Sequence, residues 1–145
     1  LRFDPAQTRV GVNQEAVVNL VVENIQDLFA VPFALSFDPQ VVELVRVHHG
    51  SFMGGEFPAA LVYRAEAETG TAIISVSRPP GATGVSGQGV LVTLVFRGVR
   101  PGQSVLKVDR IAARASDRQS LEVETQAGLI IVERTASRSQ AIPEQ

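Results

Sequence analysis

Leu28-Phe-Ala-Val-Pro-Phe-Ala-Leu-Ser-Phe37 alternates large apolar residues with mostly small ones over its whole length. Because successive residues of a β-strand point to opposite faces of a sheet, this alternation predicts a strand with one buried face and one outward face. The large residues are assigned to the core face: Phe29, Val31, Phe33, Leu35 and Phe37. The outward face is expected to carry Leu28, Ala30, Pro32, Ala34 and Ser36.

The outward face of this strand carries no charged side chain. Pro32 cannot donate a hydrogen bond to a β-ladder, so an exposed edge strand is one explanation of its presence. Edge strands that face solvent are usually defended by charge, however, and this one would not be. The other explanation is that a partner covers the face, and the sequence leaves both open.

Further segments carry alternating or continuous β-branched and aliphatic residues between Gly-rich or Pro-containing turns. The predicted strands are 16–25, 28–37, 61–67, 71–77, 89–99, 104–111 and 120–132. One exception is local: Asp38 can cap a single helical turn and Pro39 can occupy its first position. Short strands separated by regular turns predict an all-β sandwich without any long helix.

The composition indicates one globular domain, since the chain has 145 residues of which 45% are hydrophobic. Nucleic-acid binding is not expected, because the net charge is −2 and Lys and Arg do not cluster. The absence of cysteine excludes disulfides and thiolate metal ligands. The chain begins at Leu1 without methionine or a signal-like segment, which we interpret as a piece cut from a longer exported protein.

The adjacent pair His48 and His49 is a weak candidate for a metal site, because neighbouring strand residues point to opposite faces. Ser86 lies in Gly-Val-Ser-Gly-Gln-Gly, which is not the nucleophile elbow Gly-x-Ser-x-Gly. We therefore predict no catalytic residue, no metal ligand and no cofactor at these positions.

Two pairs of carboxylates share a predicted strand face, Glu66 with Glu68 and Glu122 with Glu124. Paired carboxylates are what glycoside hydrolysis requires. Such enzymes also need aromatic platforms for the sugar, and the chain has no Trp and a single Tyr, Tyr63. The pairs are interpreted as solvated strand faces, and the protein is predicted not to be an enzyme.

Several ordered pieces of the sequence resemble the cohesin domain family: Phe37-Asp38-Pro39 at a strand end, 41–47, Gly50-Ser51-Phe52, 70–77, 87–96 and a last strand ending near Val132. Within that family, 27–33 and 77–87 look like the cohesin-type domain at the C-terminus of some secretin-related, type II secretion-like outer-membrane proteins. The closer likeness implies a location outside the cytoplasm: cell surface, outer membrane or periplasm.

The resemblance implies a nine-stranded jelly-roll-like β-sandwich of the cohesin type. We assign residues 1–132 to this domain and 133–145 to a disordered tail or linker. Residues expected in its core are Val31, Phe33, Leu35, Phe37, Ile74, Val76, Leu91, Leu94, Phe96, Val108 and Ile130.

The resemblance also implies a non-catalytic module that binds a protein partner through one flat sheet face. In cellulosomal members the partner is a calcium-loaded dockerin, and the strand matching 28–37 presents polar contact residues. Ala30 and Pro32 stand at those outward positions here, which favours a more apolar partner, either dockerin-like or a secretion-system component. The expected partner-binding residues are Ala30, Pro32, Ala34, Ser36, Val62, Arg64, Glu66, Ile73, Ser75, Ser77 and Arg78.

Two other functions remain open at this point. Carbohydrate-binding modules of family 3 share a related sandwich, so a polysaccharide is the second candidate ligand, although flat sugar-binding faces usually need exposed aromatic rings. A structural spacer within an envelope assembly is the third candidate, and it needs no binding face at all.

Overall fold

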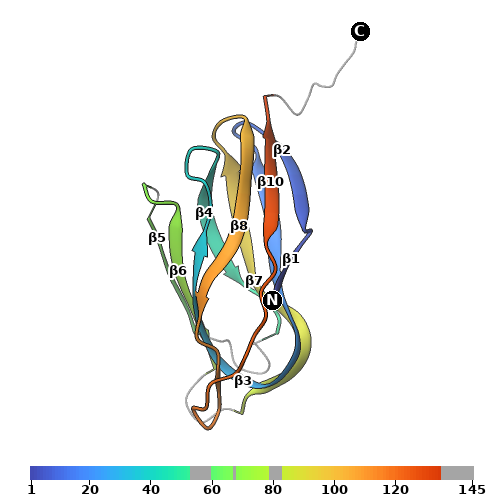
Figure 1. Cartoon of the computed structure of the whole chain (residues 1–145), viewed down its shortest axis with the longest axis vertical. Helices are drawn as coiled ribbons and strands as arrows, with labels where there is room; N and C mark the ends of the chain where they lie inside the picture. Colours follow the sequence, from blue (N-terminus) through green and yellow to red (C-terminus); the bar gives the residue numbers. More distant parts are fainter. Residues whose placement is uncertain (53–59, 67, 79–82, 135–145) are drawn as a thin grey trace.

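The computed structural model describes residues 1–52, 60–66, 68–78 and 83–134. Over these residues the chain forms strands and no helix (Figure 1). The strands are β1 (Arg2–Asp4), β2 (Gln7–Gly11), β3 (Glu15–Ser36), β4 (Val42–His49), β5 (Ala60–Glu66), β6 (Thr71–Ser77), β7 (Val85–Gly98), β8 (Gly102–Ile111), β9 (Arg114–Ala115) and β10 (Gly128–Glu133). The predicted all-β sandwich is confirmed, with ten strands described where nine were expected.

The long strand β3 belongs to both layers of the sandwich (Figure 1). Its first half pairs with β1 and β7, and β7 pairs in turn with β4. Its second half pairs with β6 on one side and with β8 and β9 on the other. The second layer therefore runs in the order β2-β10-β8-β3-β6-β5, with β5 at its edge.

The bend in β3 lies between Val22 and Leu28, where the pairing with β7 shifts register. Asn24 and Asp27 adopt left-handed backbone conformations there, with φ angles of 54° and 57°. Asn and Asp tolerate this conformation better than other non-glycine residues, so the bend has a local cause in the sequence. Segments 16–25 and 28–37, predicted as two strands, are thus one bent strand.

The bend also corrects the expectation that Leu28 points outward. Leu28 is buried in the core, and the regular alternation starts only at Ala30 and Val31. A further register shift, between Leu28 and Ala30 in the pairing with β9, accounts for the difference. Phe29, expected in the core, is only half-buried for the same reason.

Asp27 connects the bend to two neighbouring segments by hydrogen bonds. Its Oδ2 accepts hydrogen bonds from the backbone N–H and the hydroxyl of Ser116, at 3.2 and 2.7 Å. The Asp27 backbone N–H donates to the Ser86 hydroxyl at 2.9 Å. Gly84 packs so closely that a Cβ on it would lie 2.1 Å from Asp27 Oδ1. Strand β3, the start of β7 and the turn after β9 therefore meet at this residue.

The core lies between the two layers and matches the prediction from alternation. Apart from Phe29, the expected core residues are all buried: Val31, Phe33, Leu35, Phe37, Ile74, Val76, Leu91, Leu94, Phe96, Val108 and Ile130. Phe96 of β7 and Phe37 at the end of β3 form an edge-to-face pair with ring centroids 5.7 Å apart. This pair joins the two layers, because β7 belongs to one of them and the end of β3 to the other.

The expected helical turn at Asp38 is a hydrogen-bonded turn that does not continue as a helix. The Asp38 carbonyl accepts from Val41 N at 3.1 Å and from Val42 N at 3.0 Å. Val42 is already the first residue of β4. Because β4 pairs with β7, the chain continues as a strand from Val42 and the turn does not extend into a helix. The strand β4 was not among those predicted from alternation.

The C-terminal strand is shorter than predicted. Only Gly128–Glu133 is a strand, whereas 121–127 forms none, and Leu121 and Gln126 instead donate backbone hydrogen bonds to Ala113 and Leu1. Glu133, assigned to the tail, is the last residue of β10 and forms an ion pair with Arg9 at 2.9 Å. Residues 135–145 lie outside the described part, so their assignment to a linker stays a prediction.

Replacing Phe96 by Ala should lower the free energy of unfolding by about 3–5 kcal/mol, because it removes a buried ring and leaves a cavity. Urea unfolding measures the loss, with Val105→Thr as the control. Val105 is exposed on β8, so that variant should change stability by less than about 0.5 kcal/mol. Equal midpoints for Phe96→Ala and wild type would show that the core is wrongly assigned.

Replacing Asp27 by Val should cost about 2–4 kcal/mol, since a β-branched residue resists a positive φ and the bonds to Ser116 are lost. Asp27→Asn keeps the backbone preference and an acceptor oxygen, so it should cost about 1 kcal/mol. A comparison of the two unfolding midpoints tests the bend, and a Val variant no less stable than the Asn variant would contradict it.

Candidate functional site

The sheet register brings the predicted partner-binding residues onto one surface. Four cross-strand rows span β5, β6, β3 and the β8–β9 side: Ala60–Ser77–Ala30–Arg114, Val62–Ser75–Pro32, Arg64–Ile73–Ala34–Arg110 and Glu66–Thr71–Ser36–Lys107. We call these residues the outer face. Every predicted site residue except Arg78 lies in one of the rows.

Arg78 lies just beyond the end of β6 rather than in a row. Its backbone N–H donates to the Phe29 carbonyl at 2.9 Å, and its Nε donates to the Thr83 carbonyl at 3.0 Å. The guanidinium therefore ties the end of β6 to the start of β7. Residues 79–82, which follow Arg78, lie outside the described residues.

Strand β3 is central in this layer, so its proline is not explained by an exposed edge. The Pro32 carbonyl accepts a hydrogen bond from Ala112 N at 3.0 Å. In an antiparallel strand the N–H and C=O of one residue point to the same side, so the missing N–H also faces that side. Ala112 lies between the end of β8 and the start of β9. The ladder alongside β3 is interrupted there, so a backbone N–H from residue 32 is not required.

The centre of the outer face is small and apolar. Ala34 points outward but is only 6% exposed, because it lies between the longer side chains of Ile73 and Arg110 on the flanking strands. Ala34 thus lies on the outward side of β3, as predicted, but its neighbours cover it. A shallow hollow of about 640 Å³ lies here, lined by Pro32, Ala34, Ile73, Arg110 and neighbouring residues of β8.

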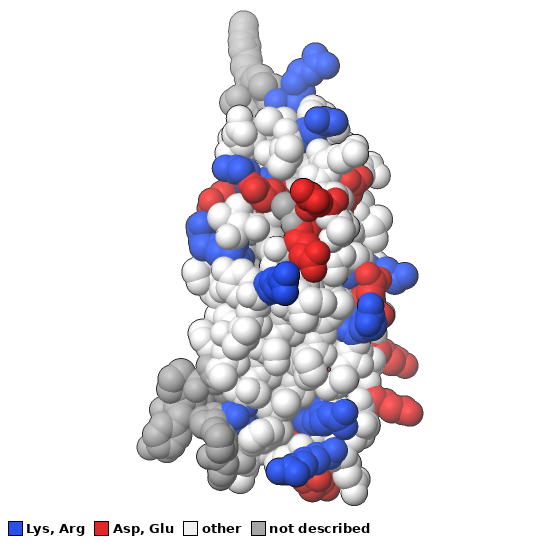
Figure 2. All heavy atoms as spheres, turned by 90° about the vertical axis from the view of Figure 1, so that its left-hand side faces the viewer, with Lys and Arg blue, Asp and Glu red and all other residues white. Residues whose placement is uncertain are grey.

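Large apolar side chains are exposed around this hollow. Val62 is 69% exposed and Ile73 is 49% exposed, both on the outer face. Figure 2, seen from the β5 and β6 side, shows an uncharged zone with both acidic and basic side chains above it and mostly Lys and Arg below it. Exposed apolar surface framed by polar residues is typical of a protein-binding surface.

The charged side chains of the outer face form no ion pair with the described residues. The side chains of Arg64, Lys107 and Arg110 form no hydrogen bond in the described ranges either, although the Lys107 backbone carbonyl accepts one from the Ser36 hydroxyl. On the outside of the other layer the charges are paired: Arg46 with Glu15 at 2.9 Å and Arg97 with Glu43. The two sheets therefore offer different chemistry to solvent.

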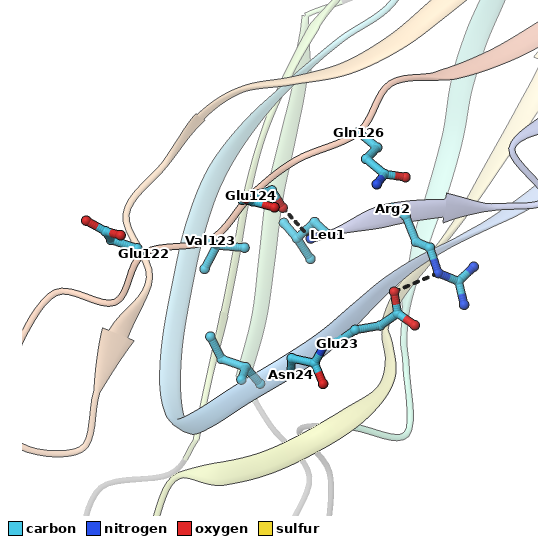
Figure 3. Close-up of a pocket in the computed structure, with 9 residues that line it drawn as sticks. Leu1, Arg2, Glu23, Asn24, Glu122, Val123, Glu124 and Gln126 are labelled. Atoms are coloured by element: carbon cyan, nitrogen blue, oxygen red, sulfur yellow. Dashed lines mark hydrogen bonds and ion pairs between the residues drawn. The ribbon is translucent and has the colours of Figure 1, made fainter.

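A second hollow, of about 270 Å³, lies between the start of the chain and 122–126 (Figure 3). Figure 3 shows Glu23 facing Arg2, with which it pairs at 3.0 Å, whereas Glu122 points away from both. The Leu1 ammonium donates to the Glu124 carbonyl at 2.5 Å, and burial lowers the pKa of this ammonium despite the nearby carboxylates. Arg2 and Glu23 are thus engaged with each other, and the ammonium is engaged with a backbone carbonyl.

The other sequence candidates do not assemble a site. His48 and His49 are exposed and pair with Thr93 and Val92 at successive positions of β4. Within the described residues, no group of three or more His, Cys, Asp or Glu could hold a metal ion. Ser86 accepts the hydrogen bond from Asp27 N, which is a structural role.

The paired carboxylates need a correction. Glu66 is the last residue of β5 whereas Glu68 lies in the following turn, so the pair does not share one strand. Glu122 and Glu124 lie in 121–127, which is not a strand, so they do not share a strand face either. The backbone bonds that this segment makes to Ala113 and Leu1 replace sheet pairing.

Comparison with solved structures identifies the architecture. A non-cellulosomal cohesin from the hyperthermophilic archaeon Archaeoglobus fulgidus superposes with a TM-score of 0.75 at 20% identity, covering 88% of this chain and 87% of that one. The chain has a cohesin-like fold. The seventh ScaB type I cohesin from Pseudobacteroides cellulosolvens gives 0.73 at 19% identity, covering 94% and 95%.

Another cohesin-like neighbour was solved with its partner. The Coh-OlpA–Doc918 complex from Clostridium thermocellum, a type I cohesin–dockerin complex, matches with a TM-score of 0.75 at 14% identity, covering 88% of this chain and 95% of that one. No model of a protein family and no curated protein sequence matches this cohesin-like chain. The likeness is therefore one of fold.

Three positive residues of the outer face were missed from the sequence: Lys107, Arg110 and Arg114. Alternation in β8 gives Lys107 an outward direction, because Leu106 and Val108 on either side are buried. The irregular pairing at Asp109 then makes Arg110 the partner of Ala34. The neighbours of β3 in the sheet could not be read from one strand's pattern, so these residues were not connected with the site.

Replacing Ile73 by Asp should leave the cohesin-like fold intact. The side chain is half exposed on the outer face, so the expected cost is about 1 kcal/mol, within the range of strand propensities. Urea unfolding with circular dichroism measures it. A loss above about 3 kcal/mol would place Ile73 in the core instead.

Proposed function

We propose that this chain is a non-catalytic protein-protein interaction module that binds its partner through the outer face. The observation that carries the proposal is the contrast between the two sheets. The outside of one sheet has arginines paired with glutamates, whereas the outer face has exposed apolar side chains together with Arg64 and Arg110, which form no ion pair with the described residues. When a partner covers the outer face, the exposed apolar side chains are removed from water, and no ion pair within the chain has to be broken.

The cohesin-like fold supports a protein as the ligand, because neighbours of this fold were solved with dockerins. The outward positions Ala30 and Pro32 offer no side-chain hydrogen bonds, which favours a dockerin-like or secretion-system partner of more apolar character. We further propose that the parent protein is exported and that this module works outside the cytoplasm. In the described residues no helix is long and apolar enough to cross a membrane.

Polysaccharide binding has less support from the outer face. Flat sugar-binding surfaces stack aromatic rings on the sugar, and none of the residues in the four rows is aromatic. Tyr63 is exposed, but it pairs with the buried Ile74 and so belongs to the opposite face of β5. A spacer role would leave the exposed Val62 and Ile73 without a purpose.

The experiment compares two matched variants in a pulldown from an envelope or secreted fraction. Ile73→Asp places a charge in the outer face, and Val17→Asp places one at a similarly exposed valine, 55% exposed, outside the other layer. Binding to Ile73→Asp should weaken at least tenfold, about 1.4 kcal/mol, whereas Val17→Asp should bind like wild type. Titration of the captured partner measures both dissociation constants.

If Val17→Asp weakens binding and Ile73→Asp does not, the binding surface lies on the outside of the other layer. If both variants bind like wild type, the outer face is not the binding surface. Retention on insoluble polysaccharide with no protein captured would favour the carbohydrate-binding alternative.

A further inference from the structure

The row Arg64–Ile73–Ala34–Arg110 narrows the chemistry of the partner, an inference that rests on the proposed function. We infer that the partner is a protein surface with a small apolar centre and carboxylates on two opposite sides of it, one for Arg64 and one for Arg110. These two carboxylates distinguish the inferred partner from one that offers only apolar contacts.

The spacing of the two arginines follows from the sheet. They occupy the outermost of four adjacent strands, β5 and β8, with Ile73 of β6 and Ala34 of β3 between them. Neighbouring strands lie about 4.7–4.9 Å apart, so the two backbones are separated by about 14–15 Å. A partner element the width of a helix, about 10–12 Å, fits between the guanidinium groups.

The floor between the arginines is mainly apolar. Ile73 is half exposed, Ala34 is covered by its neighbours, and Pro32 lies beside them in the same hollow. Within the row itself, Ile73 and Ala34 offer no side-chain hydrogen-bonding group, and the hydroxyls of Ser75, Thr71 and Ser36 lie in the two adjacent rows. The charged groups of the row stand at its two ends, where they can give a partner its direction.

Those charges require carboxylates from the partner. Arg64 and Arg110 have no ion pair among the described residues, so water solvates them in the free chain. A partner that covers the floor also removes water from both guanidinium groups. An arginine that loses its water without gaining an acceptor is costly, whereas a bidentate carboxylate repays that cost.

The acidic residues of the outer face itself do not supply these partners. Glu66 lies one row away from Arg64, and Asp109 lies at the irregular pairing beside Arg110, yet neither forms an ion pair with them. The rows on the other side of the arginines contain no carboxylate, and Arg114 ends one of them. The partner's carboxylates should therefore approach from the Val62 and Ala60 side.

The test uses binders selected for this surface. A library displayed on a small helical-bundle scaffold is selected on the wild-type chain and depleted on Ile73→Asp, so that the recovered clones require the outer face. Asp and Glu should be enriched on two sides of an apolar centre in these clones. Their dissociation constants should rise at least tenfold for the double variant Arg64→Ala/Arg110→Ala, and should rise further for Arg110→Glu.

The control is Arg9→Ala, which removes an arginine that already pairs with Glu133 away from the outer face and should leave binding unchanged. Added salt should weaken wild-type binding more than binding to the double variant. Outer-face clones without acidic enrichment, or with equal affinity for the double variant, would overturn the inference while leaving the proposed function intact. Failure to recover any clone that discriminates against Ile73→Asp would count against both.

Discussion

One strand, β3, is hydrogen-bonded into both layers of the sandwich, and the rest of the structure depends on it. It can cross between the layers because Asn24 and Asp27 accept a left-handed backbone at the bend. Asp27 then fixes the bend by its bonds to Ser116 and Ser86. The first half of β3 builds the ion-paired sheet and the second half builds the outer face, so one bend sets both surfaces relative to each other.

The outsides of the two sheets differ in how their charges are neutralised. On the β4 and β7 side, arginines are matched with glutamates inside the chain, and such exposed pairs contribute little but leave no unmet charge. On the outer face, Arg64 and Arg110 are left to solvent at little cost while the chain is alone. That asymmetry leaves two arginines on the outer face that a partner's carboxylates could pair with.

The comparison with solved cohesins shows how little sequence this architecture demands. Chains with 13–20% identity superpose with TM-scores of 0.72–0.75. The core needs only apolar residues at alternate positions, such as Phe33, Leu35 and Phe96, whereas the outward positions are free to vary. The ligand therefore cannot be transferred with the fold, and outward residues such as Pro32 and Arg64 must be interpreted in this chain.

The sequence by itself determined the core and the direction of the side chains in the second half of β3. Alternation from Val31 to Phe37 is a local property of an extended backbone, so it needed no knowledge of neighbouring strands. Only the tertiary structure decided that β3 is central, that Leu28 turns inward after the bend, and that Arg110 stands beside Ala34. These facts depend on which distant strands pair and in what register, and the pattern within a single strand does not encode either one.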